Sequence, residues 1–433
     1  MRDVKQLAEL LETLEEQMAA CMQCGMCQAV CPLYRESGLE MDVARGKIAL
    51  IRNLALDILD DPRAVKTRLE RCLLCGSCAA GCPSGVDIMD IFVRSRMIIT
   101  GYLGLSAFKK AVFRGMLSRP GVFDFSLRTA AGLQGIFTTA VNPEMGTFRS
   151  RIPAKAFKGR HFPALAEVPG HKRVLSADPG GEYAAGKIAF FPGCLTDKVI
   201  PEVAASCANI LKEHAYGLYM PGSPVCCGIP AMASGDMKSF KRLVRHNLEL
   251  YAGSDFYRLI TPCATCTATI RKTWPMLIDL FSPQERESIL ALADKTLDIT
   301  EFLADKLSAG PKEEKRAQSR VVTYHDPCHL KKSLGIKNQP REILQAASGC
   351  IFREMPGADS CCGMGGSFNL EHYPLSQQIG ERKLKNILAV NPDCVATACP
   401  ACMIQLMDVI SRAGHTIQVR HVVQVYEGHS GDG

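Results

Sequence analysis

The sequence lacks any apolar segment long enough to cross a membrane. No stretch of its 433 residues approaches the roughly 18 to 20 consecutive apolar residues that a membrane-spanning helix needs. Residues 1–16 are charged and rich in acidic residues, and they lack the apolar segment of a secretory signal peptide. We therefore expect a cytoplasmic protein, with any membrane contact limited to peripheral attachment at the inner face.

The sequence also lacks a dinucleotide-binding fingerprint. Its nearest candidate is Gly363-x-Gly365-Gly366, which does not have the G-x-G-x-x-G order and follows two adjacent cysteines. We assign these glycines to a turn beside the cysteines. The sequence therefore predicts no flavin and no nicotinamide cofactor in this chain.

Cysteine, by contrast, is abundant. Eighteen of the 21 cysteines form four ordered sets. Two sets share the C-x2-C-x2-C-x3-C-P spacing: Cys21, Cys24, Cys27, Cys31 with Pro32, and Cys72, Cys75, Cys78, Cys82 with Pro83. The other two contain five cysteines each: Cys194, Cys226, Cys227, Cys263, Cys266, and Cys328, Cys361, Cys362, Cys399, Cys402. Soft thiolates at this density hold metal, above all iron–sulfur clusters, whereas disulfide frameworks belong to small secreted domains.

Clusters on these cysteines change the meaning of the formal net charge of +7. A cubane with four thiolates carries about two negative charges when oxidised. Filling the first two sets alone lowers the net charge to roughly +3. We therefore expect no nucleic-acid partner.

The two four-cysteine sets predict a pair of cubane [4Fe-4S] clusters with crossed ligands. In this motif the fourth cysteine binds the other cluster. The first cluster is thus predicted on Cys21, Cys24, Cys27 and Cys82, and the second on Cys72, Cys75, Cys78 and Cys31. Structural zinc is the alternative, but it needs neither the third cysteine nor the proline.

Helical periodicity surrounds these sets. Apolar residues recur at helical spacing from Val4 to Met18, and residues 41–50 favour a second helix between the sets. We assign residues 1–98 to an α-helical ferredoxin domain. Residues 99–186 are predicted to form a basic connector, with an amphipathic helix over 103–117 followed by extended chain to about Gly181. The basic helix fits docking on a partner or on the cluster modules better than contact with an anionic membrane.

The remaining chain is an internal repeat. Cys194 precedes Cys328 by 134 residues, Cys227 precedes Cys362 by 135, and Cys266 precedes Cys402 by 136. Short β-type runs lead into a cysteine at 188–191, 259–261, 321–324 and 395–397, and helical patterns such as 404–410 follow. Ligands just beyond strand ends are typical of α/β units. We therefore predict two related α/β domains, at 187–310 and 318–428.

Each five-cysteine set exceeds the four thiolates that a cubane or a zinc ion requires. The adjacent pair, followed by Gly228 or Gly363, indicates an unusual cluster in which one thiolate bridges two irons. Zinc at one of the two sites remains an alternative.

Four short strings of the repeat resemble the CCG (cysteine-rich) domain family. They are Pro192-Gly193-Cys194, Cys226-Cys227-Gly228, His325-Asp326-Pro327-Cys328, and Cys361-Cys362-Gly363-Met364-Gly365-Gly366. The order of modules is similar to that of the glycolate oxidase/D-lactate dehydrogenase iron–sulfur subunit and of the D-type subunit of heterodisulfide reductase. The expected fold class is α+β multidomain, an α-helical two-cluster ferredoxin module followed by two tandem-repeat α/β CCG domains.

The resemblance implies two functions. In hydroxy-acid dehydrogenases, this kind of subunit carries electrons from an FAD-containing partner to a quinone or another acceptor. In heterodisulfide reductases, the five-cysteine sets hold noncubane [4Fe-4S] clusters that cleave a disulfide. Members of the glycolate oxidase branch often lack part of the second set, whereas both sets here are complete. The leading hypothesis is the electron-transfer subunit, and the alternative is a disulfide-reducing catalytic subunit.

A few residues outside the ligand sets are further site candidates. His325 and His329 flank Cys328 and could tune a cluster, although a turn or capping role is favoured. Lys331 and Lys332 could attract an anion, although a solvated pair is favoured. Three cysteines outside the sets are expected to have structural roles: Cys207, Cys350 and Cys394.

Overall fold

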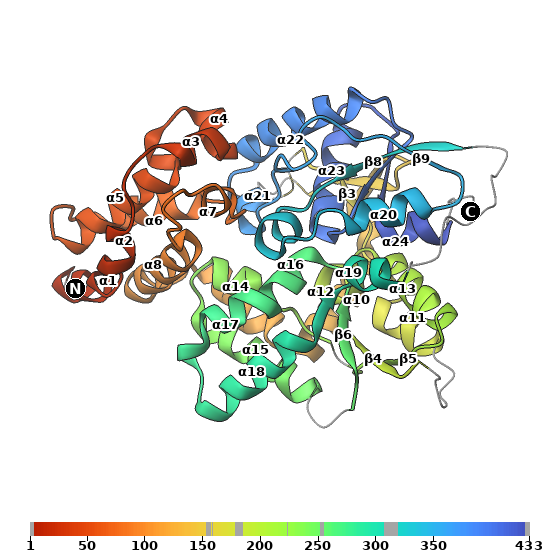
Figure 1. Cartoon of the computed structure of the whole chain (residues 1–433), viewed down its shortest axis with the longest axis horizontal. Helices are drawn as coiled ribbons and strands as arrows, with labels where there is room; N and C mark the ends of the chain where they lie inside the picture. Colours follow the sequence, from red (N-terminus) through yellow and green to blue (C-terminus); the bar gives the residue numbers. More distant parts are fainter. Residues whose placement is uncertain are drawn as a thin grey trace.

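The computed structural model describes residues 4–152, 157, 159–177, 185–222, 224–251, 255–306 and 319–428. A helical N-terminal module lies at one end of the molecule, and two α/β lobes lie side by side at the other (Figure 1). The boundaries predicted at 310 and 318 fall outside the described residues. No helix among the described residues is long and apolar enough to cross a membrane.

The N-terminal module is all helical. Its elements are α1 (Val4–Glu12), α2 (Glu15–Ala19), α3 (Met26–Val30), α4 (Pro32–Ser37), the 3-10 helix η1 (Glu40–Asp42), α5 (Ala44–Ala55), α6 (Pro62–Glu70), α7 (Ser77–Ala80) and α8 (Ile88–Leu103). Asp61 caps α6 by accepting from the amides of Arg63 and Ala64 at 3.0 Å, and Asp87 caps α8. The helix expected from Val4 to Met18 is thus two helices, and the one expected at 41–50 begins at Ala44.

The connector is more ordered than the sequence indicated. Its elements are α9 (Ala107–Lys110), the π-helix η2 (Ala111–Leu117), α10 (Pro120–Phe137), strands β1 (Thr138–Asn142), β2 (Thr147–Ser150) and β3 (Phe162–Pro163), and α11 (Gly170–Ala177). The three strands form an antiparallel sheet in the order β1-β2-β3. The prediction of extended chain after residue 117 is therefore wrong, because tertiary contacts order this segment.

Those contacts lie on both neighbouring modules. Thr147 Oγ1 lies 2.7 Å from Ser411 Oγ, and the amide of His161 donates to Asp408 at 2.9 Å, so the small sheet rests on the C-terminal lobe. Lys109 forms ion pairs with Glu70 of the helical module and Glu371 of the C-terminal lobe. The connector therefore docks on the modules that it joins.

The first α/β lobe contains a four-stranded parallel sheet in the order β5-β4-β6-β7. The strands are β4 (Lys187–Phe190), β5 (Gly217–Tyr219), β6 (Arg258–Thr261) and β7 (Thr296–Asp298). The helices are α12 (Gly193–Lys198), α13 (Pro201–Glu213), α14 (Ile229–Ala233), α15 (Met237–Tyr251), α16 (Ala264–Ala268), η3 (Thr269–Thr273), α17 (Trp274–Met276), η4 (Ile278–Leu280), α18 (Pro283–Lys295) and α19 (Ile299–Lys306).

The second lobe repeats this topology. Its strands β8 (Arg320–His325), β9 (Cys350–Phe352), β10 (Cys394–Thr397) and β11 (Gln418–His421) are all parallel, in the order β9-β8-β10-β11. Its helices are η5 (His329–Ser333), α20 (Gln339–Ala346), α21 (Ser367–Glu371), α22 (Tyr373–Leu388), α23 (Pro400–Arg412) and α24 (Val422–Glu427). The four strands predicted to lead into cysteines are confirmed, and so is the internal repeat.

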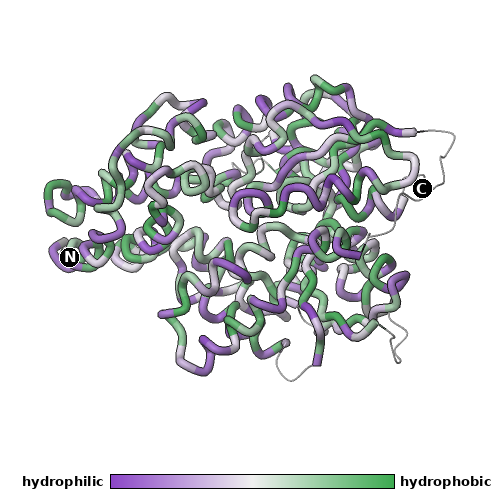
Figure 2. The backbone as a smooth tube through the Cα atoms, in the orientation of Figure 1, coloured by the Kyte–Doolittle hydropathy of each residue, from purple (hydrophilic) through white to green (hydrophobic). Residues whose placement is uncertain are grey.

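Apolar residues concentrate on the strands and inner helix faces of the two lobes, whose buried side chains form one continuous cluster (Figure 2). The helical module has its own core, formed by residues such as Leu7, Leu11 and Ile51. Cysteines of all four sets belong to these buried clusters or pack against them.

Candidate metal centres

The two four-cysteine sets line two neighbouring cavities in the helical module. One cavity is bordered by Cys21, Cys24, Cys27 and Cys82, together with Cys78. The other is bordered by Cys31, Cys72, Cys75 and Cys78. The structure thus brings together the two crossed groups that the sequence predicted. At Gly25, with φ +86°, an added Cβ would lie 2.7 Å from Arg45 Nη1, so the loop needs glycine there.

Two buried cations lie beside the second of these sets, and sequence reasoning missed both. Lys47 is 1% exposed and donates to the carbonyl oxygen of Asp42. Burial lowers the pKa of Lys47, and the nearby thiol of Cys72 opposes that shift. Arg96 donates to the carbonyl oxygen of Cys72 at 2.7 Å. Lys47 lies one helical turn before the buried Ile51. This spacing places both residues on the same face of the helix, and it is the sequence feature that could have indicated that Lys47 is buried.

The five cysteines of the first α/β lobe, here called site A, converge beyond the ends of β4 and β6. Cys194 lies in α12, the Cys226–Cys227 pair precedes α14, and Cys263 begins the α16 turn that contains Cys266. Hydrogen bonds from Cys226 and then Cys266 hold the pKa of Cys227 well below its ordinary value. The Trp274 indole donates to the carbonyl oxygen of Cys227 at 3.0 Å and fixes the pair.

The five cysteines of the second lobe, here called site B, converge in the same way. The thiol of Cys362 lies 3.4 Å from Cys402 Sγ. Hydrogen bonds from Cys361 and then Cys402 hold the pKa of Cys362 well below its ordinary value. The amide of Gly363 donates to Cys361 Sγ at 3.3 Å, just as Gly228 donates to Cys226 Sγ at 3.5 Å in site A.

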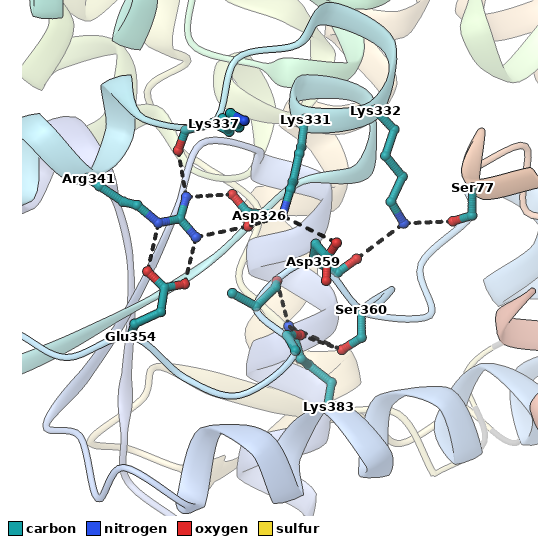
Figure 3. Close-up of polar contacts among 12 residues, drawn as sticks. Ser77, Asp326, Lys331, Lys332, Lys337, Arg341, Glu354, Asp359, Ser360 and Lys383 are labelled. Carbon is teal, nitrogen blue, oxygen red and sulfur yellow. Dashed lines mark hydrogen bonds and ion pairs between the residues drawn. The ribbon is translucent and has the colours of Figure 1, made fainter. Parts of the chain in front are cut away.

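Polar contacts hold the loop that leads into the Cys361–Cys362 pair (Figure 3). Lys383 is fully buried and donates to the carbonyl oxygens of Gly357 at 3.0 Å and Ala358 at 2.8 Å. Burial lowers the pKa of Lys383 to about 8, and the thiol of Cys362 opposes that shift. No pattern in the sequence indicated this buried cation.

Sites A and B meet at the boundary between the lobes. The amide of Ala264 donates to the carbonyl oxygen of Ala398 at 3.0 Å. The thiol of Cys263 donates to Cys399, and this hydrogen bond is the first cause of the low pKa of Cys399. The two five-cysteine sets are therefore in direct contact through one cysteine each.

Site B also borders the helical module. Leu33, Leu73, Cys75, Phe368 and Ile379 form one buried apolar cluster, against which Cys328 and Cys361 pack. His329 Nε2 lies 3.2 Å from the carbonyl oxygen of Leu74, and its Nδ1 lies 3.1 Å from Thr265 Oγ1. The favoured capping role for His329 is therefore wrong, because its ring joins the helical module to the first lobe.

The two lysines after Cys328 are also placed differently from the sequence expectation. Lys331 forms ion pairs with Asp326 at 3.3 Å and Asp359 at 3.2 Å. Lys332 donates to Ser77 Oγ at 2.6 Å and to the carbonyl oxygen of Asp359 at 3.2 Å (Figure 3). The prediction of a solvated pair is wrong, since both side chains tie the Cys328 turn to its neighbours.

The remaining three cysteines fit structural roles. Cys207 lies fully buried in α13, and burial raises the pKa of its thiol. Burial raises the pKa of Cys350 to about 11 and that of Cys394 to about 12.

The donor sets fit iron–sulfur clusters. The cavities of the helical module present four and five cysteines at their walls, with Cys78 common to both, and each α/β lobe concentrates five cysteines beside a parallel sheet. Thiolate sets of this kind hold Fe–S clusters or zinc. Fold and sites together define a protein with several metal–thiolate centres.

Comparison with known proteins shows which domain families this chain contains. Residues 188–271 and 322–407 each match the family described as cysteine-rich domain (CCG), and residues 17–86 match a 4Fe-4S dicluster domain. The chain is 29% identical over 440 residues to the probable glycolate oxidase iron-sulfur subunit of Bacillus subtilis, covering 97% of this chain and 96% of that protein.

Two other similar proteins carry names different from that of the glycolate oxidase relative. One subunit of the fumarate reductase (CoM/CoB) of Methanothermobacter marburgensis is 27% identical over 418 residues, covering 95% of this chain and 72% of that protein. Lactate utilization protein A of Geobacillus sp. is 31% identical over 243 residues, covering 55% of this chain and 98% of that protein. The chain belongs to the family of CCG-domain iron–sulfur oxidoreductase subunits.

Proposed function

We propose that the chain is the electron-transfer subunit of a flavin-dependent 2-hydroxy-acid dehydrogenase of the lactate or glycolate type. An FAD-containing partner would oxidise the hydroxy acid, and this chain would deliver the electrons to a quinone or another carrier. The names of the glycolate oxidase and lactate utilization relatives support the substrate class. The predicted absence of a flavin site in this chain explains why a partner is needed.

The observation that carries the proposal is the unbroken series of cysteine sites across the three modules. Cys78 borders both cavities of the helical module. Cys75 packs in the same apolar cluster as Cys328 and Cys361 of site B, and Cys399 of site B contacts Cys263 of site A. Iron–sulfur clusters on these thiolates supply one-electron chemistry. A series of neighbouring sites is what an electron-carrying subunit requires.

The proposed ligands are those predicted from the sequence. Two cubane [4Fe-4S] clusters are assigned to Cys21, Cys24, Cys27 with Cys82, and to Cys72, Cys75, Cys78 with Cys31. Sites A and B would hold one or two noncubane [4Fe-4S] clusters, with zinc as the alternative at one of them. Sixteen irons per chain would indicate clusters at all four sites, because each holds about four. About eight irons with two zinc ions would exclude clusters from both CCG sites.

Co-purification tests the partner. A tagged chain isolated from its own cells should bring an FAD-containing subunit, and adding lactate or glycolate should bleach the visible iron–sulfur absorption. A matched preparation of a Cys24→Ala, Cys75→Ala double variant should retain the flavoprotein but lose most of this bleaching. A preparation with full iron that never associates with a flavoprotein would overturn the proposal.

Reduction of a disulfide is the second candidate function. Both five-cysteine sets are complete, their cysteines are largely buried, and Cys263 and Cys399 join them. The name of the fumarate reductase (CoM/CoB) relative supports a sulfur substrate. A reductase would convert one disulfide, two electrons and two protons into two thiols. Reduced viologen with a disulfide, yielding no thiol, would exclude this function.

Attachment to the inner face of the membrane is a separate proposal. Phe108 and Phe125 are each 73% exposed and Ile136 is 62% exposed, close in sequence to the cations Lys110 and Arg128. Apolar side chains beside cations suit an anionic lipid surface. The protein should float with anionic vesicles and much less with neutral ones, and equal recovery in both fractions would contradict this proposal.

A further inference from the structure

Site B contains an imidazole in addition to its five cysteines. His325 ends strand β8 and is 1% exposed. One ring nitrogen of His325 and the sulfur atoms of Cys362 and Cys402 all lie within 4.8 Å of one another. Three soft or borderline donors at this spacing can bind one metal ion, because Fe–S and zinc sites accept both thiolate and imidazole ligands.

The protein gives this imidazole no other use. Among the described residues, neither Nδ1 nor Nε2 of His325 has a hydrogen-bond partner outside site B, and the ring interacts with Cys362 of site B itself. Leaving a buried polar group unpaired costs free energy, so native structures rarely do so without a reason. The neighbouring His329 differs, since its two nitrogens contact Leu74 and Thr265. A metal ion at site B would satisfy one nitrogen of His325.

Site A has no counterpart to this histidine. The repeat offset of 134 residues that relates Cys194 to Cys328 places Phe191 at the position of His325. Strand register agrees, because Phe190 pairs with Ile260 in the first sheet and Tyr324 pairs with Ala396 in the second. Phe191 is 1% exposed and packs on the ring of Tyr251. The two sites therefore share the pattern of their cysteines and differ at the position of His325.

We propose that His325 is a nitrogen ligand of the metal centre at site B, which makes site B a mixed histidine–cysteine centre while site A remains all-thiolate. The inference rests on the proposed presence of metal at site B. A neutral imidazole donates less charge than a thiolate, so histidine ligation raises the potential of an iron–sulfur centre, as Rieske centres show. Mixed ligation also suits zinc. His325 thus gives site B a donor that site A lacks.

The test uses the full chain labelled with nitrogen-15 only in histidine. If site B holds iron, electron–nuclear double resonance of the reduced protein should show a nitrogen-15 hyperfine coupling. If it holds zinc, zinc-edge X-ray absorption should show a nitrogen shell at about 2.0–2.1 Å. His325→Phe, which copies site A, should lose this signal. The matched control His329→Phe should keep it, since His329 contacts Leu74 and Thr265 instead.

Each outcome separates this inference from the proposed function. Metal at site B without a histidine signal in the parent protein would overturn the ligand assignment and leave electron transfer standing. A signal retained in His325→Phe would also overturn it. If that variant fails to fold, the parent spectrum and His325→Gln decide in its place. Metal analysis showing none at site B would overturn both the ligand and the four-site proposal.

Discussion

His329 Nε2 donates to the carbonyl oxygen of Leu74 at 3.2 Å, and so ties the CCG lobes to the loop that carries Cys75. Because Nε2 carries the proton, Nδ1 is left to accept from the hydroxyl of Thr265, 3.1 Å away in the other lobe. Thr265 Oγ1 in turn lies 3.5 Å from Cys399 Sγ. One side chain thus contacts the helical module and the first lobe from a position next to Cys328.

Replacing His329 should loosen this three-way junction. We expect His329→Ala to lower the free energy of unfolding by about 1–3 kcal/mol, because the buried Leu74 carbonyl and Thr265 hydroxyl lose their partners. Electron transfer between the helical module and the lobes should slow, as measured by rapid mixing with a one-electron reductant. Thr265→Val removes only one of the two contacts and should have the smaller effect. Unchanged stability and rate in His329→Ala would contradict the role.

Lys383 places a buried positive charge beside site B. We expect Lys383→Met to lower the midpoint potential of the centre at site B, because a nearby cation stabilises the added electron. The loop at 357–360 should also become less protected in hydrogen exchange, since it loses the bonds to Gly357 and Ala358. Lys385→Met, on the same helix, serves as the control, and equal shifts in the two variants would refute the prediction.

Gly363 is predicted to be irreplaceable at the turn after the Cys361–Cys362 pair. Its φ is +96°, and an added Cβ would lie 2.5 Å from the carbonyl oxygen of Ser376. Gly363→Ala should therefore reduce metal content at site B and lower the thermal midpoint. Gly414, at φ +77° with nothing within 4 Å of its Cβ position, is the matched control for backbone strain alone, about 1–2 kcal/mol. Similar losses in both variants would show that the close contact is unimportant.

Asp298 should make stability depend on pH. Burial raises the pKa of this carboxyl group to about 7, although Thr300 and Thr267 donate to it. Because the folded protein keeps a proton that the unfolded chain releases near pH 4, the free energy of unfolding should fall as pH rises from about 4 to 7 and level off above. Asp298→Asn should flatten this slope between about pH 4 and 7, measured by denaturant titration. An unchanged slope would assign the pH dependence to other groups.

Much of the fold and of the candidate sites could be predicted from local sequence. The four strands that lead into cysteines carry short β-type runs, and the helical module carries a distinctive cysteine spacing. Residues 118–177 could not be predicted in the same way. Helix α10 and the β1–β3 sheet are ordered by tertiary packing, in which the sheet contacts distant residues such as Ser411 and Asp408, and no local pattern encodes such partners.

The sequence by itself predicted the proposed ligand sets, because the repeated cysteine spacings are typical of metal–thiolate sites. It also determined the internal repeat, since the offsets of 134 to 136 residues recur along the chain. Only the tertiary structure decided how the sites are ordered in space, which lysines and histidines face them, and that the ring of His325 lies within reach of Cys362 and Cys402. These features depend on side chains brought together across three modules, and a linear pattern does not record distances between modules.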